Sequence, residues 1–134
     1  MGVRRKAREL ALQCLYQIEQ SGNRDVDIQH MRLHFEVSKK AVDYGQKLIN
    51  GIKTHFAEID GLISQHAVNW RLDRMSVIDR NLLRIAVFEL VFSDDVPASV
   101  AINEAIEIAK RFSTPDSGSF LNGILDSIRK SSSA

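Results

Sequence analysis

Residues 97–126 read PASVAINEAIEIAKRFSTPDSGSFLNGILD, and this stretch decides the fold. Apolar residues recur at helical spacing on both sides of a short polar turn, which predicts two amphipathic helices, at residues 98–112 and 115–130. Thr114 and Pro115 form a typical cap and first-turn pair for the second helix. The stretch holds no set of metal ligands and no nucleophile beside a base, so it indicates no catalytic chemistry.

The rest of the chain carries the same helical period. It predicts further helices at residues 4–20, 24–35, 38–54, 56–68 and 75–92, with Ser38 as an N-cap. No run of alternating residues is long enough to form a sheet. We therefore expect an all-α fold, a compact helical bundle of about seven helices. The helix at residues 75–92 is apolar almost all round, which is typical of a helix at the centre of a bundle.

A chain of 134 residues suits one domain. We expect that domain over residues 1–130, and a disordered tail at residues 131–134. A polar link at residues 69–74 leaves open a division into two small helical subdomains that share the central helix. Cys14 is the only cysteine, which fits a reducing compartment, and its place in an apolar stripe predicts that it is buried. Without a long apolar run or a recognisable signal peptide, a soluble cytoplasmic protein is expected.

The helix at residues 4–20 carries positive charge at its N-terminus, where positive charge lowers the stability of a helix. Its first turn and the residues beside it hold four cations, namely Arg4, Arg5, Lys6 and Arg8. The helix dipole is positive there, so each cation costs roughly a few tenths of a kcal/mol. Tyr16 falls opposite the apolar stripe and is expected to face solvent beside Leu12 and Glu9. Cations beside an exposed aromatic ring are typical of single-stranded nucleic-acid binding, although a solvated N-terminus with an ordinary surface tyrosine would look the same.

The polar turn at residues 113–117 is a second candidate site. Free backbone N–H groups at the start of the following helix could hold a phosphate together with the hydroxyls of Ser113, Thr114 and Ser117. Ordinary structural roles stay open for Lys110, which suits a helix C-terminus, and for Asp116, a natural first-turn acid. Phe120 lies at the margin of an apolar face, so both a core position and a partly exposed stacking surface stay open.

The charge of residues 73–95 is opposite to that of the N-terminus. Five acidic residues stand there against three basic ones, a local charge of −2, whereas residues 1–8 carry +4. This contrast suggests two faces for two kinds of partner, and an acidic face with exposed Val87 or Val91 could receive a basic protein. A normal mixed surface is the alternative. Glu89 shares a helix face with Ile78, so we expect it to be buried and paired.

Three strings of the sequence occur in the order typical of one known family. These strings are RRKARELALQCLYQ at residues 4–17, IDRNLLRIAVFEL at residues 78–90 and the stretch at residues 97–126. Through them nearly the whole chain resembles the NusB family of transcription antitermination factors. The resemblance implies an RNA-binding adaptor. It also implies that the basic N-terminal segment, the tyrosine of the first helix and the turn before the last helix form one surface for the single-stranded boxA element of nascent RNA. The matching positions are Arg4, Arg5, Lys6, Arg8, Gln13, Tyr16, Lys110, Asp116, Ser117, Phe120 and Asn122.

The resemblance also implies a protein partner. NusB proteins pair with NusE, a small ribosomal-subunit protein, through the helix at residues 75–92 and its surroundings, which here implies contacts at Asp79, Arg80, Leu83 and Val87. The pair would hold RNA better than either protein alone, because the partner adds basic surface and RNA contacts. The resulting antitermination complex with RNA polymerase would read through terminators, chiefly in ribosomal RNA operons.

Other functions are weakly indicated. His30 and His34 have the spacing of a zinc-binding helix, but position 31 is Met rather than Glu and no third ligand is evident, so we expect no metal and no cofactor. Similar helical domains precede the catalytic domain of some ribosomal RNA methyltransferases, which makes an accessory domain one alternative. That alternative requires a nucleotide-type glycine-rich loop, and these 134 residues contain none. A homodimeric structural module is the second alternative, since some family members are thought to self-associate.

Overall fold

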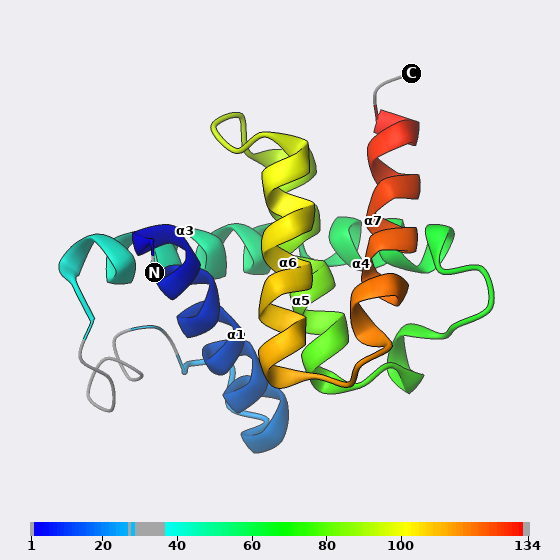
Figure 1. Cartoon of the computed structure of the whole chain (residues 1–134). Helices are drawn as coiled ribbons and strands as arrows, with labels where there is room; N and C mark the ends of the chain where they lie inside the picture. Colours follow the sequence, from blue (N-terminus) through cyan, green and yellow to red (C-terminus); the bar gives the residue numbers. More distant parts are fainter. Residues whose placement is uncertain (1, 27, 29–36, 133–134) are drawn as a thin grey trace. The chain divides into compact units, whose positions relative to one another are not determined.

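A computed structural model describes residues 2–26, 28 and 37–132 (Figure 1). Within that part of the chain every regular element is helical, which confirms the predicted all-α class. The α-helices are α1 (Val3–Ser21), α3 (Lys39–Thr54), α4 (Phe56–His66), α5 (Val77–Val87), α6 (Ala98–Phe112) and α7 (Ser117–Ser132). A 3₁₀-helix, η1, covers Leu72–Arg74, and a π-helix, η2, covers Phe88–Phe92. None of these helices combines the length and the apolar character needed to cross a membrane.

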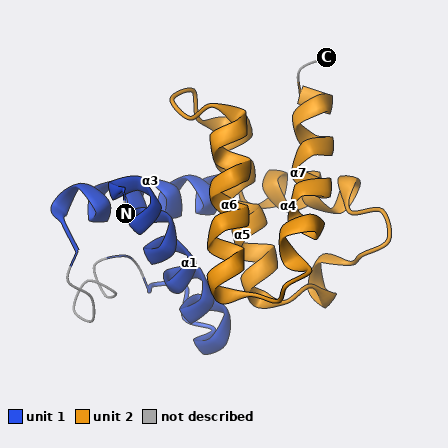
Figure 2. Ribbon diagram, viewed as in Figure 1, with its two compact units in different colours: residues 1–54 blue, residues 55–134 orange. Residues whose placement is uncertain are grey.

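The chain divides into two compact units, residues 1–54 and residues 55–134 (Figure 2). The boundary between the units falls between α3 and α4. It does not fall at the polar link of residues 69–74, which the sequence suggested as a possible boundary between two subdomains. The link lies inside the second unit, where η1 gives it a short helical turn. We describe the two units separately as unit 1 and unit 2.

Unit 1 is built on the packing of α1 against α3. α1 ends at Gly22, whose φ of 73° only glycine adopts readily, and whose N–H donates to the Ile18 carbonyl oxygen at 2.9 Å. α3 begins after Ser38, whose Oγ accepts a hydrogen bond from the Ala41 N–H at 3.2 Å, which confirms the predicted N-cap. The helix predicted at residues 24–35 lies mostly outside the described residues.

The two helices of unit 1 approach closely at Gly45. A Cβ atom on Gly45 would lie 3.3 Å from the carbonyl oxygen of Ala7 on α1, closer than a side chain normally sits. Cys14 is fully buried, as predicted. Leu12 and Glu9 are buried as well, so the prediction that they face solvent is wrong. A helical period reveals one apolar stripe, whereas α1 is covered on more than one side.

Unit 2 is organised around α5, which contacts α4, α6 and α7. Every residue of the chain from position 81 to position 89 is buried, in agreement with the predicted central helix. Arg84 is held there by Asp60 of α4, through Nε to Oδ1 at 2.8 Å and Nη2 to Oδ2 at 3.0 Å. Its Nη1 donates to Asn81 Oδ1 at 2.9 Å. Paired in this way, the guanidinium links α4 to α5 without leaving a buried charge uncompensated.

The π-helix η2 continues α5 and changes the phase of its last turn. An uninterrupted α-helix would place Val87 and Val91 on one face, because they are four residues apart. The structure buries Val87 and leaves Val91 37% exposed, and the segment that follows Val87 is the π-helix that begins at Phe88. Glu89, at the start of this turn, is buried and has interaction partners, as predicted.

α6 and α7 form an antiparallel pair joined by a tight turn (Figure 1). α7 begins at Ser117, two residues later than predicted from the Thr114–Pro115 pair, because the Ser117 N–H closes a turn on the Thr114 carbonyl oxygen at 3.1 Å. α7 also extends to Ser132, so the first two residues of the predicted disordered tail are helical. The Ser132 hydroxyl donates to the Ile128 carbonyl oxygen at 2.9 Å in this last turn.

Candidate nucleic-acid interface

The four cations at the start of α1 differ in exposure. Arg4 is exposed and Arg5 and Lys6 are partly exposed, whereas Arg8 is only 3% exposed. Arg8 is therefore a buried side chain and not part of an open surface. Tyr16 is 38% exposed, as predicted, and at about 100° per residue it lies within about 20° of Arg5 around the helix. Tyr16 and Arg5 thus share one face of α1, and Gln13 lies partly exposed beside them.

A second tyrosine, which the sequence did not single out, lies among the same cations. The guanidinium carbon of Arg4 lies 4.5 Å from the centroid of the Tyr44 ring on α3. Arg8 lies 5.9 Å from that centroid, and the Lys47 ammonium 5.8 Å from it. These are cation–π distances, so Tyr44 gathers three cations from two helices. Lysines spaced four residues before and three residues after Tyr44 are the signal that could have identified it.

The turn before α7 is engaged with α5. Ser113 Oγ donates to Asp79 Oδ1 at 2.7 Å, and Ser117 Oγ donates to Asp79 Oδ2 at 3.0 Å. The two hydroxyl oxygens are 2.6 Å apart because both converge on one carboxylate. Ser117 is 2% exposed. The predicted phosphate site at these hydroxyls is therefore wrong, since the carboxylate of Asp79 takes the place of the anion.

A groove between α6 and α7 is lined in part by residues of this turn. It has a volume of about 670 Å³ and is lined by Ile106, Lys110, Ser113, Thr114, Pro115, Gly118, Ser119 and Asn122. Two residues of the predicted RNA surface, Lys110 and Asn122, therefore line one groove. The Lys110 ammonium also pairs with Glu107 at 3.0 Å, and both side chains remain accessible. Gly118 keeps the helices close, because a Cβ there would lie 3.3 Å from Ile106 Cγ2.

Phe120 lies on a different side of α7 from the groove. It stands two residues before Asn122, about 200° around the helix, and Asp116 precedes it by one turn. The partly buried Phe120 ring contacts the indole of Trp70, with centroids 5.6 Å apart and an interplanar angle of 78°. Trp70 is 57% exposed. Trp70 therefore adds an exposed aromatic ring beside Phe120. It lies in the polar link of residues 69–74 and was not among the residues predicted from the sequence.

The four residues predicted for the protein partner are not an open surface. Leu83 and Val87 are fully buried, so they are core residues of unit 2, and the prediction that they contact a partner is wrong. The period of α5 could not reveal this, because the helix is covered on all sides. Asp79 is partly buried and accepts the two serine hydroxyls. Arg80 is partly buried and its Nη1 donates to the Met75 carbonyl oxygen at 2.8 Å.

The predicted contrast in charge follows the division into units. Unit 1 contains ten Lys and Arg against six Asp and Glu, a formal charge of +4. Unit 2 contains eight against eleven, a charge of −3. Among the residues that the structure describes, no three His, Cys, Asp or Glu side chains gather as metal ligands. His30 and His34 lie outside those residues.

The chain is similar to NusB proteins over almost its whole length. The profile of the NusB family matches residues 5–130. The transcription antitermination protein NusB of Desulfotalea psychrophila is 48% identical over 136 aligned residues, which cover 96% of each chain. A crystal structure of T. maritima NusB is 45% identical, covers 95% of this chain and 90% of its own, and superposes with a TM-score of 0.83. A chain from a crystal structure of the antitermination factors NusB and NusE in complex with double-stranded RNA is 27% identical, with 96% and 97% coverage and a TM-score of 0.82. With its profile, its sequence identity and its fold in agreement, the chain belongs to the NusB family.

Proposed function

We propose that this protein is an RNA-binding adaptor in transcription antitermination. It binds the single-stranded boxA element of nascent transcripts together with NusE, and so helps RNA polymerase to read through terminators, chiefly in ribosomal RNA operons. It acts in the cytoplasm, where transcription takes place. NusB proteins are antitermination factors and not enzymes, in agreement with the sequence prediction.

One observation carries the RNA-binding part of the proposal. The face of α1 that holds Arg5 presents the exposed ring of Tyr16, and the first turn of that helix contains no acidic residue. An exposed ring can stack on a base of a single strand, while Arg5, about three turns earlier on the same face of α1, meets the phosphates. The exposed Trp70 against Phe120 supplies a second aromatic surface in unit 2. The groove with Lys110 and Asn122 supplies polar side chains that can reach a ribose or a phosphate.

The charge of unit 2 supports pairing with a basic protein. Its net charge of −3 includes three exposed acids in the stretch at residues 73–95, namely Asp73, Asp94 and Asp95. Val91 is exposed beside the last two and gives the acidic surface an apolar residue. We infer that NusE approaches this stretch, with Asp79 and Arg80 at its edge. The related complex that contains NusE shows that a NusB protein of this fold can pair with it.

A binding comparison tests the proposal. Three RNAs of equal length are titrated against the full chain with NusE present: a boxA strand, the same strand scrambled, and a boxA duplex. The duplex is included because the related complex holds double-stranded RNA. The proposal predicts that the boxA strand binds tightest. Equal binding of the scrambled strand would reduce the surface to a basic patch without sequence preference.

A further inference from the structure

Both described helices of unit 1 begin with cations where acids would be stabilising. Neither α1 nor α3 has an acidic residue in its first turn. α1 carries Arg4, Arg5 and Lys6 there, and α3 carries Lys39 and Lys40. Each cation is disfavoured by the positive end of the helix dipole. The same unfavourable choice in two helices that pack together indicates a shared anionic ligand.

Cations and an aromatic ring also form a stripe along α3. Lys40, Tyr44 and Lys47 are spaced i, i+4 and i+7, so they lie within about 60° of one another around the helix. Lys40 and Lys47 are exposed, and Lys40 forms no ion pair with any residue that the structure describes. Arg4 joins them from α1, with its guanidinium over the Tyr44 ring. We call these four residues, Arg4, Lys40, Tyr44 and Lys47, the Tyr44 stripe.

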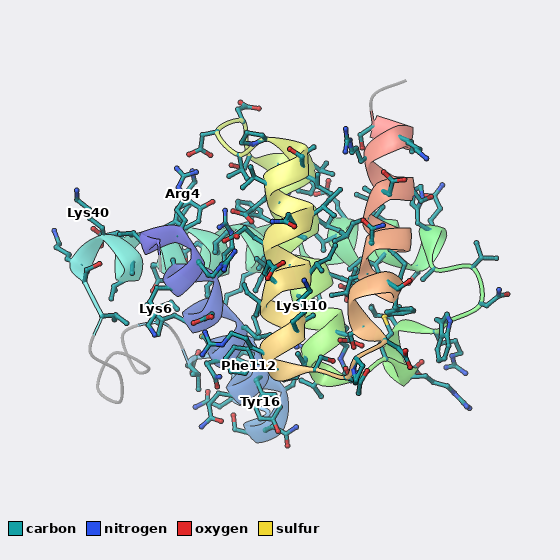
Figure 3. All side chains as sticks on the ribbon, viewed as in Figure 1. Arg4, Lys6, Tyr16, Lys40, Lys110 and Phe112 are labelled. Carbon is teal, nitrogen blue, oxygen red and sulfur yellow. The ribbon has the colours of Figure 1, made fainter. Side chains whose placement is uncertain are left out.

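The packing of unit 1 holds these cations close together. Gly45 allows α1 and α3 to approach, and Tyr44 beside it then lies beneath Arg4. In Figure 3, Arg4 and Lys40 extend from the same side of unit 1, whereas Lys6 extends from another. The ring attracts cations to its face, but the cations repel one another. Asp43, the one acid of α3, lies about 40° from Lys47 and about 60° from Lys40 around the helix, at the edge of the stripe. One carboxylate stands against three cations there, so a bound anion would still lower their mutual repulsion.

The stripe is distinct from the face of α1 that carries Tyr16. Arg5 lies within about 20° of Tyr16, but Arg4 is about 120° away from it. Large exposed apolar side chains occur on several described helices, but α3 has none. Protein interfaces generally have an apolar centre, whereas a nucleic-acid backbone is bound by cations and polar groups. Charge and composition therefore favour RNA over a protein as the ligand.

We propose that the Tyr44 stripe binds the phosphodiester backbone of single-stranded RNA that flanks the boxA element. Lys40 and Lys47 act as point charges toward phosphates, and Tyr44 is a positioning residue that holds the guanidinium of Arg4 in place. The stripe would add affinity for any flanking sequence, because backbone contacts carry no base information. This inference rests on the proposed function, since it extends the binding site of the same RNA.

The test uses the full chain with NusE and a boxA RNA carrying about eight extra nucleotides on each side, a length within the range that single-strand sites cover. Lys40→Ala/Lys47→Ala is compared with the original protein over a series of salt concentrations. We expect a threefold to tenfold loss of affinity at about 0.1 M salt, and a decrease of about 1.4 in the slope of log affinity against log salt, about 0.7 for each lost phosphate contact.

Two variants control for the fold and for charge in general. Lys40→Arg/Lys47→Arg keeps both charges and should bind like the original protein. Lys53→Ala removes one charge from the opposite side of α3, where the ammonium donates to the Arg24 carbonyl oxygen at 3.0 Å, and should leave the salt slope unchanged. Circular dichroism checks that each variant is helical.

The outcomes separate this inference from the proposed function. Unchanged affinity and slope in the alanine variant, while Tyr16→Ala weakens binding, would overturn the stripe and leave the adaptor in place. A loss of NusE pairing in the absence of RNA, with RNA affinity intact, would overturn it in favour of a protein interface. If the original protein itself shows no preference for boxA RNA, the proposed function fails first.

Discussion

The hydroxyl of Ser117, the first residue of α7, donates to Asp79 in the first turn of α5 across 3.0 Å. Ser117 is almost fully buried, and Ser113 donates to the other oxygen of the same carboxylate. Asp79 also lies where a helix dipole favours an acid, and its N–H donates to the Ser76 Oγ at 3.1 Å. One acidic side chain therefore joins the start of α5 to the turn between α6 and α7.

Removing that carboxylate or its donor should lower stability. Ser117→Ala leaves a partly buried acid with one donor fewer, and a hydrogen bond to a charged group is worth about 1.5–3 kcal/mol. We expect a loss of that size in the free energy of unfolding, measured by urea denaturation. Ser119→Ala, two residues further along α7 and exposed, is the matched control and should change stability by less than about 0.5 kcal/mol. Equal stability of both variants would show that the Asp79 link contributes nothing.

Pairing with NusE is better tested away from Asp79, because a change there would also disturb α7. Asp94 is exposed within the acidic stretch of unit 2. Asp94→Lys should weaken NusE binding by about twofold to fivefold at low salt, mainly through slower association, and should leave RNA affinity unchanged when NusE is absent. Asp126→Lys makes the same charge change on α7 and serves as the control. If both variants pair with NusE equally well, the stretch at residues 73–95 is not the docking surface.

Tyr16 and Phe120 should contribute to RNA binding by stacking. Tyr16→Ala and Phe120→Ala are each expected to weaken boxA binding by about 1–3 kcal/mol, because each removes an aromatic surface for a base. Tyr16→Phe keeps the ring and should bind almost normally. Fluorescence anisotropy of labelled RNA measures the affinities, and thermal unfolding shows whether the variants are folded. If the double variant is folded and binds boxA RNA with unchanged affinity, these two rings do not stack on the bases of the RNA.

Trp70 provides a direct signal for the surface around Phe120. It is the only tryptophan of the chain, it is exposed, and its indole contacts the Phe120 ring edge to face. If RNA reaches Phe120, titration with boxA RNA should change the tryptophan emission with the same midpoint as the binding curve. A scrambled strand at equal concentration is the control. Unchanged emission at saturating RNA would place the bound strand elsewhere on the protein.

Helix positions could be predicted well from the sequence, because periodicity and caps are local features. The helix at residues 98–112 and the Ser38 cap occur as predicted. The end of the central helix could not be predicted, because a π turn depends on how the surrounding helices pack. Val87, one of the two valines of which one was expected to be exposed, is buried because α5 is covered on all sides, which a helical period does not reveal.

The candidate site was predictable only in part. Tyr16 could be placed on the surface because it lies opposite an apolar stripe. Ser117 could not be recognised as buried, because its partner Asp79 lies 38 positions earlier in the chain. Trp70 and Tyr44 were missed for the same reason, since their significance comes from Phe120 and Arg4, which approach them only in the folded chain.

The central claim is that one protein holds RNA and NusE at the same time, so that each strengthens the binding of the other. The most direct measurement is the dissociation constant of boxA RNA with and without saturating NusE, together with that of NusE with and without saturating RNA. Because coupling is reciprocal, both constants should decrease by the same factor, about 5–150-fold for coupling of about 1–3 kcal/mol. A factor of one in both directions, or weaker binding of either ligand when the other is present, would contradict the adaptor mechanism.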